Sequence, residues 1–271
     1  MAVELPKTDT LALRREGWVL HVTLNRPAVR NAMSFQMTEE LVAVFEAVAP
    51  PRDVRAIVLR GAGGHFCAGG DVKDMAGART AIAQDGERDP LAVANRKFGT
   101  MLQRMQSSPQ AVIAVCEGAV MGGGFGLACV TDVTIAVEGA KFRLPETGLG
   151  ITPAQIMPFV VQRIGVTQAR RLAVTGGRLS AGQAVALGLA HEVVGDGNEL
   201  DERLAGVLEQ IKACAPGAVA LTKKLVFSVG KKPLAEVLDD AADDFAVAAR
   251  GPEGVEGMTA FISKKKPSWA S

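Results

Sequence analysis

The sequence offers few of the residues that build metal sites or disulfide frameworks. Its three histidines lie far apart and in no metal-binding motif, so we interpret each as structural. Its four cysteines show neither CxxC nor zinc-ligand spacing, and three lie in apolar stretches where cysteine behaves as a small hydrophobic residue. These residues are His21, His65, His191, Cys67, Cys116, Cys129 and Cys214. We therefore expect no bound metal and a reducing compartment.

Long apolar runs and an imbalance of charge are also missing. No stretch of about 18 apolar residues occurs, and residues 1–10 lack the apolar segment of a signal peptide. Lys and Arg number 30 against 29 Asp and Glu, a formal net charge of +1 that favours neither nucleic acid nor an anionic membrane. We expect a cytoplasmic protein that binds neither.

The pattern that is present is typical of a globular α/β domain. With 271 residues, of which 48% are hydrophobic and 22% charged, the chain can form one large domain with an extension. Apolar runs predict strands at residues 11–13, 18–24, 54–59, 111–116 and 133–137, the first two joined as a hairpin.

Helix signals alternate with these strands and, after residues 141–143, continue alone. Ser34 is expected to cap a helix, and Ser180 with Gln183 predicts a capping box. Further helices are expected to begin near Pro216, Pro233 and Pro252. The pattern predicts an α/β core at residues 1–200 and a helical region at 201–271. Residues 76–90 are polar and without period, which predicts a mobile loop.

Two glycine-rich turns each lie between a predicted strand and a predicted helix. The first runs from His65 to Asp71 (HFCAGGD) and the second from Gly118 to Gly124 (GAVMGGG). Glycine lets a ligand approach the main chain, and the first N–H groups of a helix have no partner within it. If both turns faced one point, they would form an oxyanion hole. The alternative is that either glycine run only permits a tight turn. A phosphate cradle is disfavoured because neither turn matches GxxxxGK[ST] or GxGxxG.

The order of several short motifs resembles the enoyl-CoA hydratase/isomerase (crotonase) family. These motifs are Asn25-Arg26-Pro27, Phe66 to Asp71, the triplet Gly122 to Gly124, and Pro145-Glu146. The match extends from about Leu11 to Lys266. It implies a crotonase-like α/β spiral of ββα turns, a C-terminal helical trimerisation region, and homotrimers or hexamers made of two trimers. It also implies an acyl-CoA substrate and no separate cofactor, since coenzyme A is part of the substrate.

The resemblance also implies roles for individual residues. The amides of Ala68 and Gly123 match the oxyanion donors, Glu146 matches a catalytic acid/base, and the amide of Ala154 matches a water-binding group. Phe245 and Lys264 match residues that a neighbouring subunit presents to coenzyme A; by composition alone, Lys264 to Lys266 would be a solvated helix end. The other residues expected beside coenzyme A are Arg30, Ala68, Gly69, Gly70 and Asp71.

Two positions depart from the family pattern. Two-glutamate hydratases carry a further glutamate two residues after the glycine triplet, where this chain has Gly126. Glu117 stands where asparagine is usual, and we interpret it as a structural substitution at a strand end. With Glu146 as the one catalytic carboxylate, water addition and Δ3,Δ2 double-bond migration both stay open, as does a non-catalytic acyl-CoA-binding role.

The sequence at Gly122 to Cys129 and at Thr152 to Val161 resembles one subgroup of the family, the isohexenylglutaconyl-CoA hydratases of acyclic terpene breakdown. This resemblance implies hydration of a branched glutaconyl-CoA, which has a second carboxylate and an apolar tail. Met75, Phe98, Met101, Met105 and Phe159 are candidates to line a pocket for the tail, although each is more often ordinary core.

Overall fold

The computed structural model describes residues 3–49, 53–79 and 86–271. Nine strands lie within these ranges: β1 Leu11–Glu16, β2 Val19–Leu24, β3 Ala56–Gly61, β4 Ala111–Cys116, β5 Ala119–Met121, β6 Val133–Val137, β7 Lys141–Arg143, β8 Arg178–Ser180 and β9 Glu192–Val194. The helices of the described residues are α1 Phe35–Val48, α2 Val72–Arg79, α3 Pro90–Gln106, α4 Gly123–Cys129, α5 Met157–Thr175, α6 Ala181–Ala186, α7 Asn198–Lys212, α8 Pro216–Ser228, α9 Leu234–Arg250 and α10 Pro252–Ile262.

Two sheets organise the core. The larger has the order β1-β2-β3-β4-β6-β9; the β1–β2 hairpin is antiparallel and every other pairing is parallel. All six residues of β4 are buried, as expected for a central parallel strand covered on both faces. The smaller sheet, β5-β7-β8, pairs the second glycine-rich turn with the segment that leads to Glu146.

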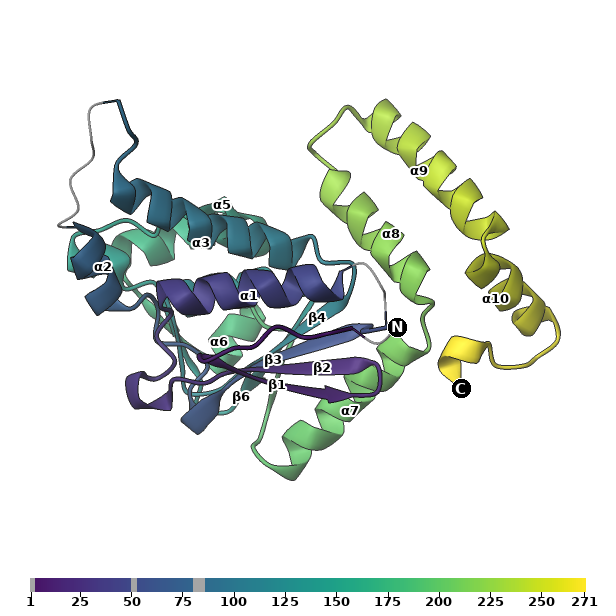
Figure 1. Ribbon diagram of the computed structural model, residues 1–271, viewed down its shortest axis with the longest axis horizontal. Coiled ribbons are helices and arrows are strands. Elements are labelled where there is room, and N and C mark those ends of the chain that lie inside the picture. Colours follow the sequence, from purple (N-terminus) through teal and green to yellow (C-terminus); the bar gives the residue numbers. More distant parts are fainter. Residues whose placement is uncertain (1–2, 50–52, 80–85) are drawn as a thin grey trace.

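Helices cover both faces of the larger sheet (Figure 1). The main apolar cluster includes residues of α1, α3, α4 and α5 together with the sheet, and a second cluster joins the other face to α7 through Leu200, Leu204 and Val207. Because α7 begins at Asn198 and packs on the sheet, the predicted division after residue 200 falls inside a core helix.

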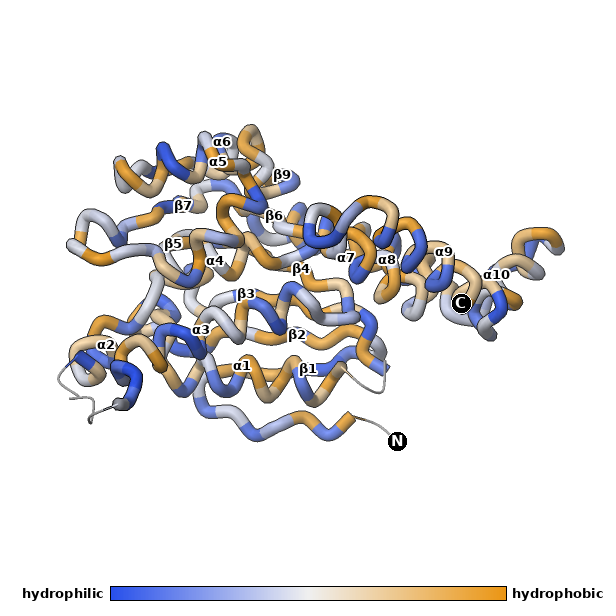
Figure 2. Tube along the Cα trace, turned by 90° about the horizontal axis from the view of Figure 1, so that it is seen from above, coloured by the Kyte–Doolittle hydropathy of each residue, from blue (hydrophilic) through white to orange (hydrophobic). Residues whose placement is uncertain are grey.

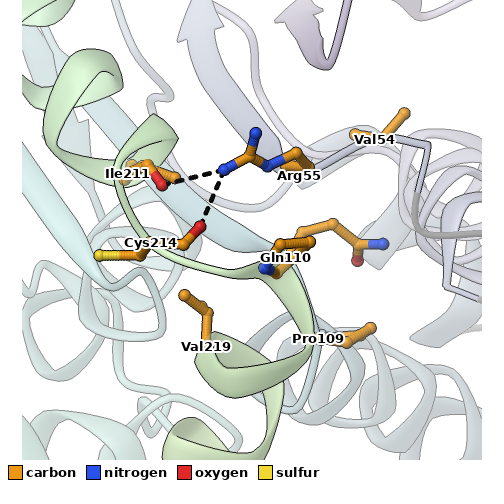
Figure 3. A pocket seen from close by; sticks show the side chains of 8 residues that line it. Val54, Arg55, Pro109, Gln110, Ile211, Cys214 and Val219 are labelled. Atoms are coloured by element: carbon orange, nitrogen blue, oxygen red, sulfur yellow. Dashed lines mark hydrogen bonds between the residues drawn. The ribbon is translucent and has the colours of Figure 1, made fainter. Parts of the chain in front are cut away.

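Beyond α7, helices α8 to α10 extend away from the core (Figure 1). Arg55 joins the two regions: its guanidinium donates to the carbonyl oxygens of Lys212 and Cys214, both at 2.8 Å, at the end of α7. Figure 3 shows the bond to Cys214 and a longer one, 3.3 Å, to the carbonyl of Ile211. Lys223 of α8 donates to the Gln110 carbonyl and to Asp132, each at 2.6 Å. The cavity beside Arg55 measures about 10 Å³ and therefore holds no substrate.

The C-terminal helices leave large apolar side chains in solvent. Figure 2 shows hydrophobic stretches along α9 and α10, outside the core. Phe245, Phe261 and Ile262 are 74%, 85% and 80% exposed. Within the described residues no single helix is long and apolar enough to cross a membrane; α7 and α8, bent by 95°, meet the length and composition test only as a pair.

Most predicted elements are confirmed, with two corrections. The Ser34 cap and the Ser180–Gln183 capping box are present, and Pro216, Pro233 and Pro252 lie at helix starts. The loop prediction was wrong for residues 76–79, which belong to α2, and residues 80–85 lie outside the described ranges. The helices-only prediction after β7 was also wrong, because β8 and β9 follow.

Candidate active site

The two glycine-rich turns meet in the structure. Phe66 and Cys67 donate their amides to the carbonyls of Glu117 and Ala119, and Met121 donates back to Cys67, with N···O distances of 2.8 to 2.9 Å. A Cβ placed on Gly122 would lie 3.6 Å from the Cα of Gly69. The turns are thus in van der Waals contact, the arrangement that an oxyanion hole requires.

On the first turn, the free amide belongs to Gly70 and not to Ala68. The Ala68 N–H donates to the Arg30 carbonyl at 2.9 Å, which corrects its predicted role as an oxyanion donor. Met33 donates to the Gly69 carbonyl and accepts from Asp71, so those two groups face Met33. Because N–H groups alternate in direction along a strand, the Gly70 amide faces the opposite way. It has no protein acceptor within the described residues.

On the second turn, Gly123 is the first residue of α4. Its amide therefore precedes the intrahelical hydrogen bonds and has no protein acceptor among the described residues. Gly122, just before it, has a φ of 50°, which side-chain-bearing residues rarely adopt. A Cβ on Gly122 would also lie 2.8 Å from Oε1 of Glu146. Glycine at this position lets the helix start and the carboxylate come together.

Glu146 is the acidic side chain that faces this meeting point. It begins a short 3-10 helix, Glu146–Leu149, directly after Pro145. Its Oε2 is buried and has no hydrogen-bond partner among the residues that the structure describes. Burial raises the pKa of this carboxyl, and its own backbone amide opposes the shift only in part. A carboxyl with a raised pKa and an unused oxygen is suited to exchange protons near neutral pH.

The space of the absent glutamate is filled by an apolar residue. A Cβ on Gly126 would lie 2.3 Å from Cγ2 of Ile156, whose side chain is buried. The site therefore lacks a second carboxylate at this position and has no free volume to hold one. Any water at the reacting carbon must be activated without it.

Asp71 has a structural task beside the first turn. Its carboxylate pairs with Arg26 at 2.8 Å and accepts from the Lys73 amide at 2.9 Å. Burial alone would raise the pKa of Asp71, but these hydrogen bonds outweigh burial and hold the pKa below its usual value. The side chain therefore fixes the start of α2 and leaves no unpaired carboxylate for a ligand.

Cys67 is buried inside the first turn. Burial raises the pKa of its thiol to about 11, so it is a neutral group and not a nucleophile at neutral pH. Cys116 and Cys129 are buried as well, while Cys214 is exposed. In the described ranges no three His, Cys, Asp or Glu side chains are grouped to hold a metal ion.

A cavity of about 210 Å³ opens beside both amides and Glu146. Met75 and Phe98 line it as the sequence predicted, and so does Ala154. Met101 and Met105 are fully buried core residues, and Phe159 packs against the core instead. The polar side chains of the lining are Thr38, Asn95, Thr152 and Gln155, and its charged ones, within the described residues, are Asp71 and Glu146.

Asn95 and Gln155 are site residues that the sequence analysis missed. Asn95 precedes Phe98 by three residues on α3, so the helical period that marked Phe98 also places Asn95 on that face. The side-chain oxygen Oε1 of Gln155 lies 2.0 Å from the position that a Cβ on Gly99 would take. Gly99 thus makes room for this amide, a relation between distant residues that no local pattern indicates.

The predicted contacts to coenzyme A outside the cavity are not brought to it within one chain. Phe245 and Lys264 lie in the C-terminal region, which extends away from the core (Figure 1). Arg30 is exposed, with φ 50°, and is linked to the first turn through its carbonyl. Glu117 pairs with Arg60 at 3.0 Å, which agrees with a structural role at the end of β4.

Comparison with known proteins decides the family. The model of the enoyl-CoA hydratase/isomerase family matches residues 14–271. This chain belongs to that family. Two solved structures, an enoyl-CoA hydratase/isomerase from Marinobacter aquaeolei and AtuE from Pseudomonas aeruginosa, are each 55% identical with a TM-score of 0.94. Both alignments cover 97% of this chain, and 99% and 100% of those chains. The expected crotonase fold is thereby confirmed.

A more distant relative is the mevalonyl-coenzyme A hydratase SIDH of Beauveria bassiana. It is 31% identical over 93% of this chain and 91% of its own length. The family assignment therefore rests on nearly the whole chain and not on the glycine-rich turns alone.

Proposed function

We propose that this protein is an enoyl-CoA hydratase in which Glu146 is the one catalytic acid/base. The observation that supports this most strongly is the buried Oε2 of Glu146, which has no partner among the described residues. Its carboxyl lies against Gly122 and lines the same cavity as Gly70 and Gly123. In the proposed complex, the amides of Gly70 and Gly123 donate to the thioester oxygen. Negative charge that develops on this oxygen is then stabilised where water is excluded.

Water addition requires one proton to leave water and one to reach the α-carbon. The Glu146 carboxylate removes a proton from water while the water oxygen bonds to the β-carbon. The electrons of the double bond move to the thioester oxygen, which gives an enolate held by the two amides. The protonated Glu146 then delivers its proton to the α-carbon, and the carboxylate is restored. One molecule of water is consumed, and no other reactant is needed.

The proposed substrate is a branched glutaconyl-CoA such as isohexenylglutaconyl-CoA. Met75 and Phe98 offer an apolar surface to a branched tail. The described lining contains no lysine or arginine, so a second carboxylate would be bound by neutral donors such as Asn95 and Gln155. The relative SIDH is named a mevalonyl-coenzyme A hydratase, so hydration of an acyl-CoA is the activity given to a protein that this chain resembles over most of its length. A role in acyclic terpene breakdown would follow from this substrate, and we propose the cytoplasm as its location.

A second candidate activity is Δ3,Δ2 double-bond isomerisation. The observation that favours it is the filling of the Gly126 position by Ile156, since proton transfer between two carbons needs no second carboxylate to hold water. A non-catalytic acyl-CoA-binding role is less well supported, because a purely binding site has no use for a buried carboxyl with a raised pKa.

Coenzyme A itself would be held by more than one subunit. We propose that Phe245 and Lys264 contact coenzyme A bound mainly in a neighbouring subunit, and that Arg30, Gly69 and Gly70 lie along it in the same subunit. The large exposed side chains of α9 and α10 would be buried between subunits of a homotrimer or hexamer.

A panel of enoyl-CoAs read by mass spectrometry tests the proposal. It includes isohexenylglutaconyl-CoA, methylglutaconyl-CoA, crotonyl-CoA and a trans-3-enoyl-CoA. We expect the glutaconyl thioesters to gain the mass of one water. Chromatographic change of the 3-enoyl-CoA without a change in mass would show the isomerase instead, and no turnover of any thioester would refute both activities.

A further inference from the structure

The two donors of the proposed oxyanion hole come from segments about 50 residues apart in the chain. Their separation must be held closely, because a displacement of about 1 Å can cost about a hundredfold in rate. Backbone hydrogen bonds already join the two segments: Phe66 and Cys67 donate to Glu117 and Ala119, and Met121 donates to Cys67. The amide of Ala119 also lies at this contact, and its partner is a side chain.

That side chain is His65. The Ala119 N–H donates to Nδ1 of His65 with an N···N distance of 3.1 Å. A backbone amide can only donate, so Nδ1 accepts and the neutral ring carries its proton on Nε2. The ring is pressed against the second turn: a Cβ on Gly118 would lie 2.4 Å from Nδ1, and Gly118 has a φ of 52°. The imidazole therefore adds one hydrogen bond to the contact between the turns.

The backbone of His65 is fixed on its other side by Asn31. The side-chain nitrogen Nδ2 of Asn31 donates to the backbone carbonyls of His65 at 2.6 Å and Ala62 at 2.8 Å. Its side-chain oxygen Oδ1 accepts from the backbone amide of Arg26 at 2.9 Å. Asn31 is fully buried. The backbone carbonyl of its neighbour Arg30 accepts a hydrogen bond from the Ala68 amide. The loop that fixes the first turn is thus connected through His65 to the second turn.

We propose that His65 is a positioning residue: its neutral imidazole links the two glycine-rich turns and so sets the distance between the Gly70 and Gly123 amides. His65 does not line the cavity with Glu146, so it acts through the turns and not on the substrate. This inference rests on the proposed function, since only an oxyanion hole gives that distance a catalytic meaning.

Two substitutions separate the hydrogen bond from the bulk of the ring. His65→Asn places an amide oxygen near the position of Nδ1 and keeps an acceptor for Ala119. His65→Leu keeps apolar volume but leaves the Ala119 amide without a partner. We expect kcat to fall about tenfold to a hundredfold in His65→Leu, with KM little changed, and to stay near the wild-type value in His65→Asn.

Infrared difference spectra of bound isovaleryl-CoA, a saturated thioester that cannot be hydrated, report the hole directly. The thioester carbonyl band should move to lower frequency on binding to wild type and His65→Asn, and should move less in His65→Leu. If His65→Leu is less stable but keeps the wild-type kcat and band position, the imidazole only supports the fold and the inference is wrong.

Hydrogen exchange separates this inference from the proposed function. Peptides that contain Ala119 should exchange faster in His65→Leu than in wild type or His65→Asn. A wild-type protein with no turnover and no carbonyl shift would refute the proposed function. Unchanged exchange in His65→Leu would refute the link between the turns whatever the activity.

Discussion

At the scale of single residues, the proposed oxyanion hole depends on which backbone amides are free. Ala68 and Gly70 are two residues apart, yet one amide is bonded to Arg30 and the other faces the cavity. The sequence indicated the turn but could not distinguish these amides. The difference is set by the register of the first turn against Arg30 and Met33, more than 30 residues earlier in the chain.

The Gly70 amide can be removed selectively. Gly70→Pro deletes the N–H, whereas Gly70→Ala keeps it and brings a Cβ to 3.3 Å from Sδ of Met75, a flexible neighbour. We expect Gly70→Pro to lose at least about two orders of magnitude in kcat and Gly70→Ala to lose far less. Steady-state kinetics on proteins shown to be folded by circular dichroism make the comparison. Near-normal turnover in the Pro variant would remove Gly70 from the oxyanion hole.

Burial of Glu146 also predicts a pH-dependent effect on stability. Its pKa is raised in the folded state, so folding is penalised once the carboxyl ionises. The penalty is absent below the unfolded-state pKa of about 4.3, grows as pH rises through the folded-state pKa, and is complete above it. Glu146→Gln should therefore be more stable than wild type at neutral pH.

Guanidinium unfolding of both proteins at several pH values measures this effect. The advantage of the Gln variant should shrink as pH falls toward the ordinary glutamate pKa. A difference in unfolding free energy that stays constant, or grows toward acid pH, would show that the Glu146 carboxyl is not destabilised by burial.

At the scale of secondary-structure elements, the sequence predicted what depends on local pattern. The runs at residues 111–116 and 133–137 have the bounds of β4 and β6, because a buried parallel strand is apolar throughout. The strands β8 and β9 were missed because three-residue strands have no measurable period. Their existence depends on pairing with β7 and β6, far away in the chain.

Gly126 of α4 packs against Ile156, which directly precedes α5. Two-glutamate hydratases carry a catalytic glutamate at the position of Gly126, so here an apolar contact occupies that space. Gly126→Glu should be destabilised by about 1–3 kcal/mol, because its Cβ would overlap Ile156. Ile156→Ala removes a buried side chain and is destabilising by itself, but it makes room for the new Cβ, so the double variant should lose less stability than the sum of the two single losses. Calorimetry on both single variants and the double variant measures the coupling. Effects that add to within about 0.5 kcal/mol would show that the two positions are independent.

At the scale of the whole molecule, the chain is expected to be incomplete as a monomer. Phe261 and Ile262 of α10 and Phe245 of α9 all leave large apolar side chains in solvent, and exposed apolar surface of this kind marks contact sites when it is grouped. The sequence indicated Phe245 through family resemblance alone and did not indicate Phe261 or Ile262, since a contact between subunits leaves no local pattern in one chain.

Light scattering tests the assembly. We expect a mass three or six times that of the 28.3 kDa chain. Phe261→Asp combined with Ile262→Asp should lower that mass by burying charge at the interface. A wild-type monomer with full activity would contradict the proposed contribution of a second subunit to the site.

Lys264 offers a kinetic test of the same idea. Lys264→Glu should raise KM for acyl-CoA and change kcat less, because a remote contact with phosphate contributes to binding in ground and transition states alike. The wild-type KM should rise with salt, and the variant should lose much of that dependence. A KM that is equal in both proteins at every salt concentration would exclude Lys264 from the coenzyme A site.

In the proposed mechanism, Glu146 alone moves the proton at the α-carbon. The most direct measurement is deuterium uptake at the α-carbon of isovaleryl-CoA in D₂O, followed by mass spectrometry for wild type and Glu146→Gln. The Gln side chain keeps the size of the residue but cannot exchange a proton. The account predicts uptake with wild type and none with Glu146→Gln, while calorimetry shows that both bind the thioester. Undiminished uptake with Glu146→Gln would contradict it, since another group would then be the acid/base.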